Sequence, residues 1–241
     1  MVAFQGRTPR PNNGAVADNG SFSFEDWHFG NTLSGTFNVF HADGRPIITK
    51  ELTANIVESG ISRNGRLAFC ITANSSTEDG HKLFLFDLSI GLELFSVTPQ
   101  RFRVDGYTFD GKKIELIAKI SGGGEYRYGA AGELIDAGKA DDAYLHSTSY
   151  DAIILTAQKL FAEQALSPEK AREVLVAVIC ARSLGADTNP AWKPTALKVQ
   201  GLAHELLSEY REAIALYEEA LSLNPKIGVK RKLDSLRKRL D

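Results

Sequence analysis

The sequence predicts a segregated α+β protein, with an antiparallel β module first and α-helical hairpins after it. Three observations predict this order. Apolar and polar residues alternate with a two-residue period in the first half, for example over 36–40 and 82–88. Asn-Gly and Asp-Gly pairs such as Asn64-Gly65 interrupt these runs, and such pairs favour hairpin turns because both residues tolerate positive φ. After Asp136, helix-period runs of Ala, Leu, Glu, Lys and Arg take over.

Length and composition restrict the possible classes. The 241 residues suffice for one large domain or two modest ones, and 43% of them are apolar. A net charge of −2 argues against a globally basic nucleic-acid binder. No apolar stretch approaches the roughly 20 residues of a membrane span. Cys70 and Cys180 both lie in apolar patterns, so we expect buried free thiols and a cytoplasmic location.

The chain divides into four predicted segments. Residues 1–20 are rich in Gly, Pro and Asn and predict a flexible lead. Residues 21–137 form the predicted β-rich module, in which Asp43-Gly44, Asp79-Gly80, Asp105-Gly106 and Asp110-Gly111 are the further expected turns. Residues 138–150 are the expected linker, and residues 151–241 the helical domain.

The β module repeats itself. Ser62–Ile71 followed by Lys82–Leu94 is matched by Phe109–Ala118 followed by Glu125–Leu134. Turn glycines recur at Gly65 and Gly111, and again at Gly44, Gly91 and Gly132. This order resembles the blades of WD-repeat β-propellers, without their Gly-His or Trp-Asp signatures. About two blades and a partial one, over 22–52, are too few for a ring of roughly 4–8 blades. A small sandwich, or blades pooled in an oligomer, remain alternatives.

The segment Pro194–Pro225 resembles a tetratricopeptide repeat (TPR). The small and large positions of that family are matched in order by Leu197, Gly201, Ala213, Tyr217, Ala220 and Pro225. Gly201 and Ala213 are small, which permits two antiparallel helices to approach closely, and Pro225 ends the second helix. His204 departs from the large aromatic that the family usually has.

A weaker copy covers Ile153–Leu184. With a shift of 42 residues, Ala171, Leu175 and Val178 take the places of Ala213, Tyr217 and Ala220, and Lys159 that of Gly201. Ser167 is the expected N-cap of its second helix, with Pro168 at the first helical position. Val229, Leu233, Leu236 and Leu240 then share one face of a final capping helix.

The TPR resemblance implies a groove formed by the first helix of each repeat, which takes a peptide or a partner helix. In Pro194–Pro225 the groove positions would be Thr195, Lys198, Leu202 and Glu205. Leu202 stands where the family's chaperone-tail clamp has Asn, so that specificity is not implied. The resulting hypothesis is a non-enzymatic adaptor or scaffold with a protein or peptide partner. The alternative is a structural subunit that associates through open edges of the β module, either with another copy in a homo-oligomer or with another chain.

The other clusters of polar residues give little indication of a catalytic or metal site. The pairs Asp26/His28 and His41/Asp43 lack the spacing of metal ligands, and no nucleophile elbow is present, so the sequence predicts no catalytic, cofactor or metal residue. The stretch 226–241 has a charge of +5, from seven Lys and Arg against two Asp. It is either a solvated helix face or a patch for nucleic acid or an anionic surface.

Overall fold

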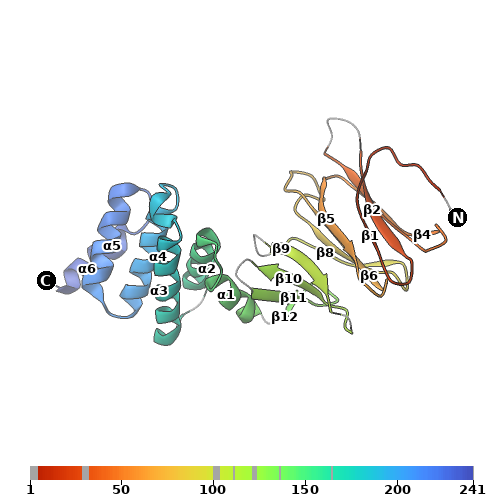
Figure 1. The fold of residues 1–241 in the computed structure, drawn as a ribbon. Coiled ribbons are helices and arrows are strands. Elements are labelled where there is room, and N and C mark those ends of the chain that lie inside the picture. The colour runs from red at the N-terminus through yellow and green to blue at the C-terminus, as the bar shows by residue number, and fades with distance from the viewer. Residues whose placement is uncertain are drawn as a thin grey trace. The chain divides into compact units, whose positions relative to one another are not determined.

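The computed structural model describes residues 5–28, 33–99, 104–110, 112–120, 124–135, 137–163 and 165–240. The chain forms two compact units, Met1–Lys119 with Tyr126–Asp136, and Ile120–Glu125 with Ala137–Asp241. β-Sheets come first along the chain and helices follow (Figure 1). The segregated α+β class predicted from the change of period is therefore confirmed.

Three antiparallel sheets of four strands each make up the β part. The first contains β1 (Pro11–Val16), β2 (Phe22–Trp27), β3 (Gly35–Phe40) and β4 (Pro46–Leu52). The second contains β5 (Ile56–Ile61), β6 (Leu67–Thr72), β7 (Leu83–Asp87) and β8 (Leu92–Val97). The third contains β9 (Val104–Phe109), β10 (Leu116–Ile120), β11 (Gly124–Tyr128) and β12 (Leu134–Ile135). Each sheet is a meander, because strands adjacent in sequence are adjacent in the sheet.

The recurring glycines mark the same turn in each sheet. Gly44, Gly91 and Gly132 lie between the third and fourth strands, with φ of 84°, 66° and 79°. A residue with a Cβ is strained at such φ values, so glycine suits these positions. Gly65, between β5 and β6, has φ of 67°. The repeat inferred from glycine spacing therefore corresponds to three successive sheets of the same design.

Two expectations about this part are wrong. The sequence predicts residues 11–16 within the flexible lead, but they form β1 and pair with β2. Most of β1 is exposed, so backbone hydrogen bonds to β2 hold it in the sheet. Its sequence therefore lacks the apolar alternation that would predict a strand. The first sheet is thus complete and not partial. The pair Asp105-Gly106 lies inside β9, because strand pairing overrides a local turn preference. Gly111 lies outside the described residues.

The first and second sheets pack face to face. Their shared hydrophobic cluster includes Phe37 and Val39 of β3 with Phe84 and Phe86 of β7, each at most 1% exposed. The rings of Phe37 and Phe86 have centroids 5.6 Å apart. Cys70 lies in the same cluster, so its predicted burial is confirmed, and burial raises the pKa of its thiol well above the ordinary value.

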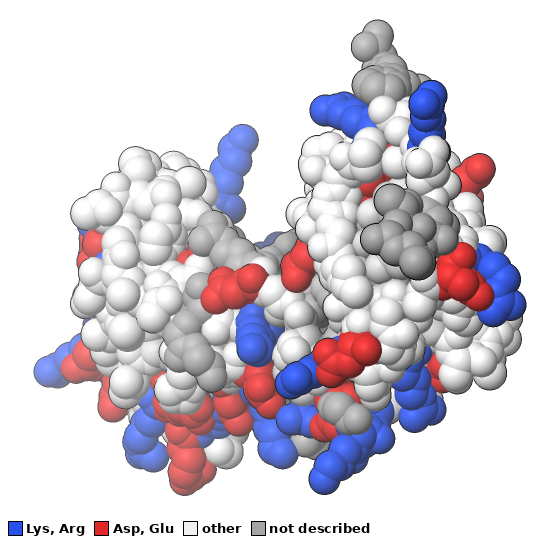
Figure 2. All heavy atoms as spheres, turned by 45° about the vertical axis from the view of Figure 1, so that its right-hand side comes forward, with Lys and Arg blue, Asp and Glu red and all other residues white. Residues whose placement is uncertain are grey.

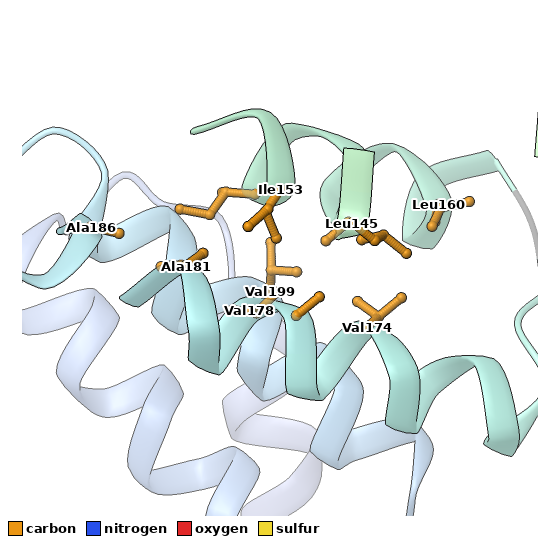
Figure 3. Close-up of a cluster of buried hydrophobic side chains, with 12 residues drawn as sticks. Leu145, Ile153, Leu160, Val174, Val178, Ala181, Ala186 and Val199 are labelled. Atoms are coloured by element: carbon orange, nitrogen blue, oxygen red, sulfur yellow. The ribbon is translucent and has the colours of Figure 1, made fainter. Parts of the chain in front are cut away.

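Helices make up the second unit. The described α-helices are α1 (Ala137–Leu145), α2 (Tyr150–Glu163), α3 (Pro168–Ser183), α4 (Lys193–Leu206), α5 (Tyr210–Leu223) and α6 (Lys230–Leu240). Side chains from α2, α3 and α4 meet in one buried cluster, among them Ile153, Val178 and Val199 (Figure 3). Leu145 of α1 joins this cluster, so most of the expected linker 138–150 is a packed helix.

The start of α3 is confirmed as predicted. The hydroxyl of Ser167 accepts a hydrogen bond from the Lys170 N–H at 3.2 Å, and proline occupies the first helical turn. The predicted burial of Cys180 is wrong, because this residue is exposed. The buried stripe of α3 runs through Val174, Val178 and Ala181, at helical spacing, and position 180 falls beside it.

Charge and hydropathy add two general facts. None of the helices in the described ranges is both long and apolar enough to cross a membrane. On the face shown in Figure 2, acidic and basic side chains are intermixed over the surface, in keeping with a net charge of −2.

Candidate peptide-binding groove

The hairpin of α4 and α5 is built around one close contact. A Cβ placed on Gly201 would lie 2.5 Å from Cε1 of Tyr217, so the ring of Tyr217 occupies the space that any larger residue at 201 would need. Leu197, Ala213, Tyr217 and Ala220 are all 0% exposed. Pro225 follows the end of α5, where it cannot continue the helix. The residues singled out by spacing thus lie at the contact between the two helices or at its end.

Three helices surround a cavity of about 540 Å³ in this unit. From α4 the wall includes Lys198, Leu202, Glu205 and Leu206. α2 contributes Gln158, Phe161 and Ala162, α6 contributes Lys232 and Arg239, and Val229 lies directly before the first residue of α6. In each helix these residues recur at intervals of three, four or seven, so each helix turns one stripe toward the cavity. We call this cavity the α2–α4–α6 groove.

The lining of the groove combines apolar and charged side chains. Phe161, Leu202, Leu206 and Val229 supply apolar surface. The charged lining residues are three cations, Lys198, Lys232 and Arg239, against the single carboxylate of Glu205. A partly apolar lining with excess positive charge suits a segment that carries apolar and acidic side chains.

Glu205 already has partners inside the protein. Its Oε2 accepts a hydrogen bond from the Tyr217 hydroxyl at 2.6 Å. The Nζ of Lys232 lies 3.1 Å from Oε1 and 3.0 Å from Oε2, and so joins α6 to α4. Burial, together with the bond to the Glu205 carboxylate, raises the pKa of Tyr217 well above its ordinary value, so the hydroxyl remains a donor.

The side chain of Lys198, unlike that of Glu205, has no polar partner inside the described part of the protein. Its side chain is only partly buried, and the described residues provide it with no ion pair or side-chain hydrogen bond. Arg239, in contrast, lies over the ring of Tyr210 at 5.7 Å, and its Nη1 donates to the Tyr210 hydroxyl at 3.4 Å. Neither Lys198 nor Arg239 is paired with a described carboxylate, but Arg239 has Tyr210 as a partner, so Lys198 is the groove cation that has no polar side-chain partner among the described residues.

The sequence-based groove positions are only partly brought together. Lys198, Leu202 and Glu205 line the groove, whereas Thr195, one turn earlier on α4 and partly buried, does not. Their role in binding stays a prediction. The contributions of α2 and α6 were missed, although a signal existed for α6. The 34-residue period typical of TPR sequences carries Thr195, Lys198 and Glu205 onto the lining residues Val229, Lys232 and Arg239.

The helix pair α2 and α3 corresponds to α4 and α5 in a slightly different register from the predicted one. Buried Ile153, Ile154 and Leu160 of α2 lie 43 residues before the buried Ala196, Leu197 and Ala203 of α4. α3, however, begins 42 residues before α5. The connection after α2 is one residue longer than that after α4, which accounts for the change. Gln158 and not Lys159 therefore corresponds to Gly201.

The polar pair Asp26 and His28 has hydrogen-bond partners within the protein. The carboxylate of Asp26 accepts bonds from the Thr8 hydroxyl and from the Arg10 N–H, the latter at 2.9 Å. The ring nitrogens of His28 lie 3.1 Å from the Ser34 hydroxyl and 2.8 Å from that of Thr36. Within the described ranges, no group of three or more His, Cys, Asp or Glu side chains is placed to hold a metal ion.

The basic C-terminal stretch is partly engaged by the helical unit itself. Lys232 pairs with Glu205, and Arg237 pairs with Glu218 of α5 at 2.6 Å. The remaining exposed cations of α6 are Lys230, Arg231, Lys238 and Arg239, the last of which lies over the ring of Tyr210. Part of the positive charge of this stretch thus serves to attach α6 to α4 and α5.

No protein-family model and no curated protein matches the chain. Solved structures similar to its β part include a eukaryotic initiation factor, with 14% identity over 52% of this chain and 30% of that one and a TM-score of 0.38. The WD40 repeats of RRP9 match with 13% identity over 55% and 39%, and a TM-score of 0.39. The β-propeller domain of the Trilobed protease from Pyrococcus furiosus matches with 10% identity over 54% and 42%, and a TM-score of 0.38. The chain spans less than half the length of each of these structures.

Proposed function

We propose that this chain is a non-enzymatic protein-interaction molecule that binds a peptide segment or a helix of a partner protein in the α2–α4–α6 groove. The observation that supports this most directly is the convergence of one stripe from each of three helices on a single cavity of about 540 Å³. TPR-like hairpins are the architecture that the spacing in Pro194–Pro225 favours, and such helical repeats present concave binding surfaces.

The chemistry of the groove specifies what the partner segment should contain. An apolar side chain would pack on Phe161, Leu202 and Leu206. An acidic side chain beside it would meet Lys198, whose charge is not compensated within the described residues. Lys232 also lines the groove and adds attraction for an acidic side chain, although its charge is partly neutralised by Glu205. A basic segment would be repelled by the same arrangement.

The test is selection from a displayed library of random dodecapeptides on the full-length chain, followed by fluorescence anisotropy with the enriched peptides. We expect enriched sequences that combine an apolar residue with Asp or Glu. Lys198→Glu should weaken their binding at least tenfold, which corresponds to about 1.4 kcal/mol. Lys226→Glu is the matched control, because it makes the same charge change at an exposed site outside the groove.

Two results would overturn the proposal. One is the absence of any enriched peptide. The other is equal binding by wild type, Lys198→Glu and Lys226→Glu, which would place the binding surface elsewhere. Circular dichroism of each variant checks that the helices are retained.

A further inference from the structure

Three edge strands of the β unit surround a cavity of about 660 Å³. β1, β5 and β9 are each the terminal strand of a different sheet. Ala15 and Val16 of β1 line the cavity, together with residues 58–61 of β5 and 107–109 of β9. The lining is completed by Asp18, residues 62–64 and Phe69. We call this cavity the β1–β5–β9 cleft.

Aromatic rings form one wall of the cleft. Tyr107 and Phe109 are two residues apart on β9 and therefore lie on the same face of that strand. The ring of Phe69 lies 5.3 Å from that of Tyr107 and 5.7 Å from that of Phe109. Phe69 is 2% exposed, whereas the other two are only partly buried and line the cleft. Gly60 leaves room for this arrangement, since a Cβ there would lie 2.8 Å from Cε1 of Phe69.

Glu58 is the carboxylate beside these rings. Its Oε1 accepts a hydrogen bond from the Tyr107 N–H at 3.2 Å, which holds the carboxyl group next to β9. The side chain is partly buried, and within the described part of the chain no Lys, Arg or His pairs with it. Arg63, the cation among the described lining residues, pairs instead with Asp18 at 2.9 Å, and its side chain is 90% exposed. The cleft therefore contains a carboxylate whose charge no described cation neutralises.

A second carboxylate acts on Glu58 from the first sheet. Glu25 of β2 is 1% exposed and accepts hydrogen bonds from Asn13, Trp27 and Ser59, which are all neutral donors. Burial and the negative charge of Glu25 both raise the pKa of Glu58. A cation in the cleft would favour the ionised form of Glu58 and offset this repulsion.

We propose that the β1–β5–β9 cleft binds an arginine or lysine side chain of a partner polypeptide. The cation would pair with the Glu58 carboxylate and lie against the rings of Tyr107 and Phe109. Aromatic faces attract cations, and the planar guanidinium group suits both a ring and a carboxylate.

The surroundings of the cleft favour a polypeptide over a small free cation. The cavity is larger than one side chain requires, and edge strands offer backbone groups to an added chain. The cleft also differs from the α2–α4–α6 groove in charge. Its lining carries Asp18 and Glu58 against Arg63, whereas the groove has an excess of cations. The two sites would therefore select segments of opposite charge.

The experiment is a titration of the full-length chain at about pH 7.5 with three blocked tripeptides, in which arginine, lysine or norleucine stands between two glycines. We expect saturable binding of the arginine and lysine peptides, detected by calorimetry and by NMR shifts of the Tyr107 and Phe109 amides. Glu58→Gln should raise the dissociation constants about tenfold or more, because the cation loses its charged partner. The variant keeps the acceptor oxygen for the Tyr107 N–H. Glu78→Gln is the matched control, since it removes an exposed carboxylate outside the cleft.

Three results would overturn the proposal. The first is the absence of binding by both cationic peptides, and the second is equal binding by Glu58→Gln and Glu78→Gln, which would place the cation elsewhere. The third is binding of the norleucine peptide as tight as that of the cationic ones. Butylguanidine serves as a further probe, because equal affinity for it and for the arginine peptide would assign the cleft to small cations and not to a polypeptide. The NMR shifts of the wild type locate the site without reliance on any variant, and thermal melts check that each variant is folded.

Discussion

The hydroxyl of Tyr217 on α5 donates a 2.6 Å hydrogen bond to Oε2 of Glu205 on α4, and the same carboxylate pairs with Lys232 on α6. One side chain thus joins three helices. The two bonds differ in surroundings. Tyr217 is 0% exposed, whereas the side chain of Lys232 is 47% exposed.

This difference predicts unequal costs of mutation. Glu205→Ala should reduce the free energy of unfolding by about 1–3 kcal/mol, because the buried Tyr217 hydroxyl loses its acceptor. Lys232→Ala should cost less than about 1 kcal/mol, since a largely exposed ion pair contributes little. Urea denaturation of both variants measures the two values. Equal costs would mean that the hydrogen bond from Tyr217 does not dominate. Tyr217→Phe removes the hydroxyl itself, so no buried donor is left without an acceptor, and its cost should lie between those of the other two variants.

The close approach of Gly201 to Tyr217 predicts a strong response to a single methyl group. Gly201→Ala should destabilise the helical unit by about 1–3 kcal/mol, because the ring of Tyr217 has to move. Gly138→Ala, in α1 with no atom within 4 Å of the new Cβ, is the control and should be neutral or stabilising by up to about 1 kcal/mol. Thermal melting of both variants is the measurement, and identical melting temperatures would contradict the tight contact.

The cap of α3 predicts a smaller effect. Ser167→Ala should cost about 1 kcal/mol, because the Lys170 N–H loses its acceptor. Ser167→Asp should restore most of this stability, since a carboxylate accepts the same bond and also favours the helix N-terminus. Ser183→Ala, an exposed serine in the last turn of the same helix, should change stability by less than about 0.5 kcal/mol. Chemical denaturation distinguishes the three; equal losses for Ser167→Ala and Ser183→Ala would argue against the cap.

Glu58 on β5 predicts a pH dependence in the β unit. Burial raises the pKa of this carboxyl above 4.5, the hydrogen bond from the Tyr107 N–H opposes the rise, and Glu25 adds to it. The folded state therefore holds the proton more tightly than the unfolded state. The contribution of Glu58 to stability is fully present below about pH 4.5 and is lost as the pH rises through the raised pKa.

Glu58→Gln removes this ionisation and keeps the acceptor oxygen for Tyr107. The stability of wild type relative to Glu58→Gln should therefore fall between about pH 4 and about pH 7. Urea titrations at both pH values give the comparison. Glu78→Gln, which removes an exposed carboxylate, corrects for the change in net charge. A relative stability that rises with pH would show that the pKa is lowered and not raised.

Local patterns in the sequence were enough for several features. Positive φ at Gly44, Gly91 and Gly132 depends on the chemistry of the turn itself, so glycine spacing revealed the repeat of the sheets. Ser167-Pro168 marked the start of α3 for a similar reason, because a cap acts within one turn. The change from a two-residue to a helical period separated strands from helices.

Other features were decided only by tertiary structure. β1 is held by hydrogen bonds to β2 and not by burial, so its residues carry no apolar pattern. Lys198 and Lys232 line one groove because α5 packs on both α4 and α6 and so brings these two helices together, and a single helix cannot reveal what lies opposite it. The sequence by itself determined the turns of the repeated sheets, the start of α3 and the change from strands to helices, since these follow from neighbours a few residues away. Which faces meet and which stay open depends on contacts between distant segments, and these arise only when the elements pack together.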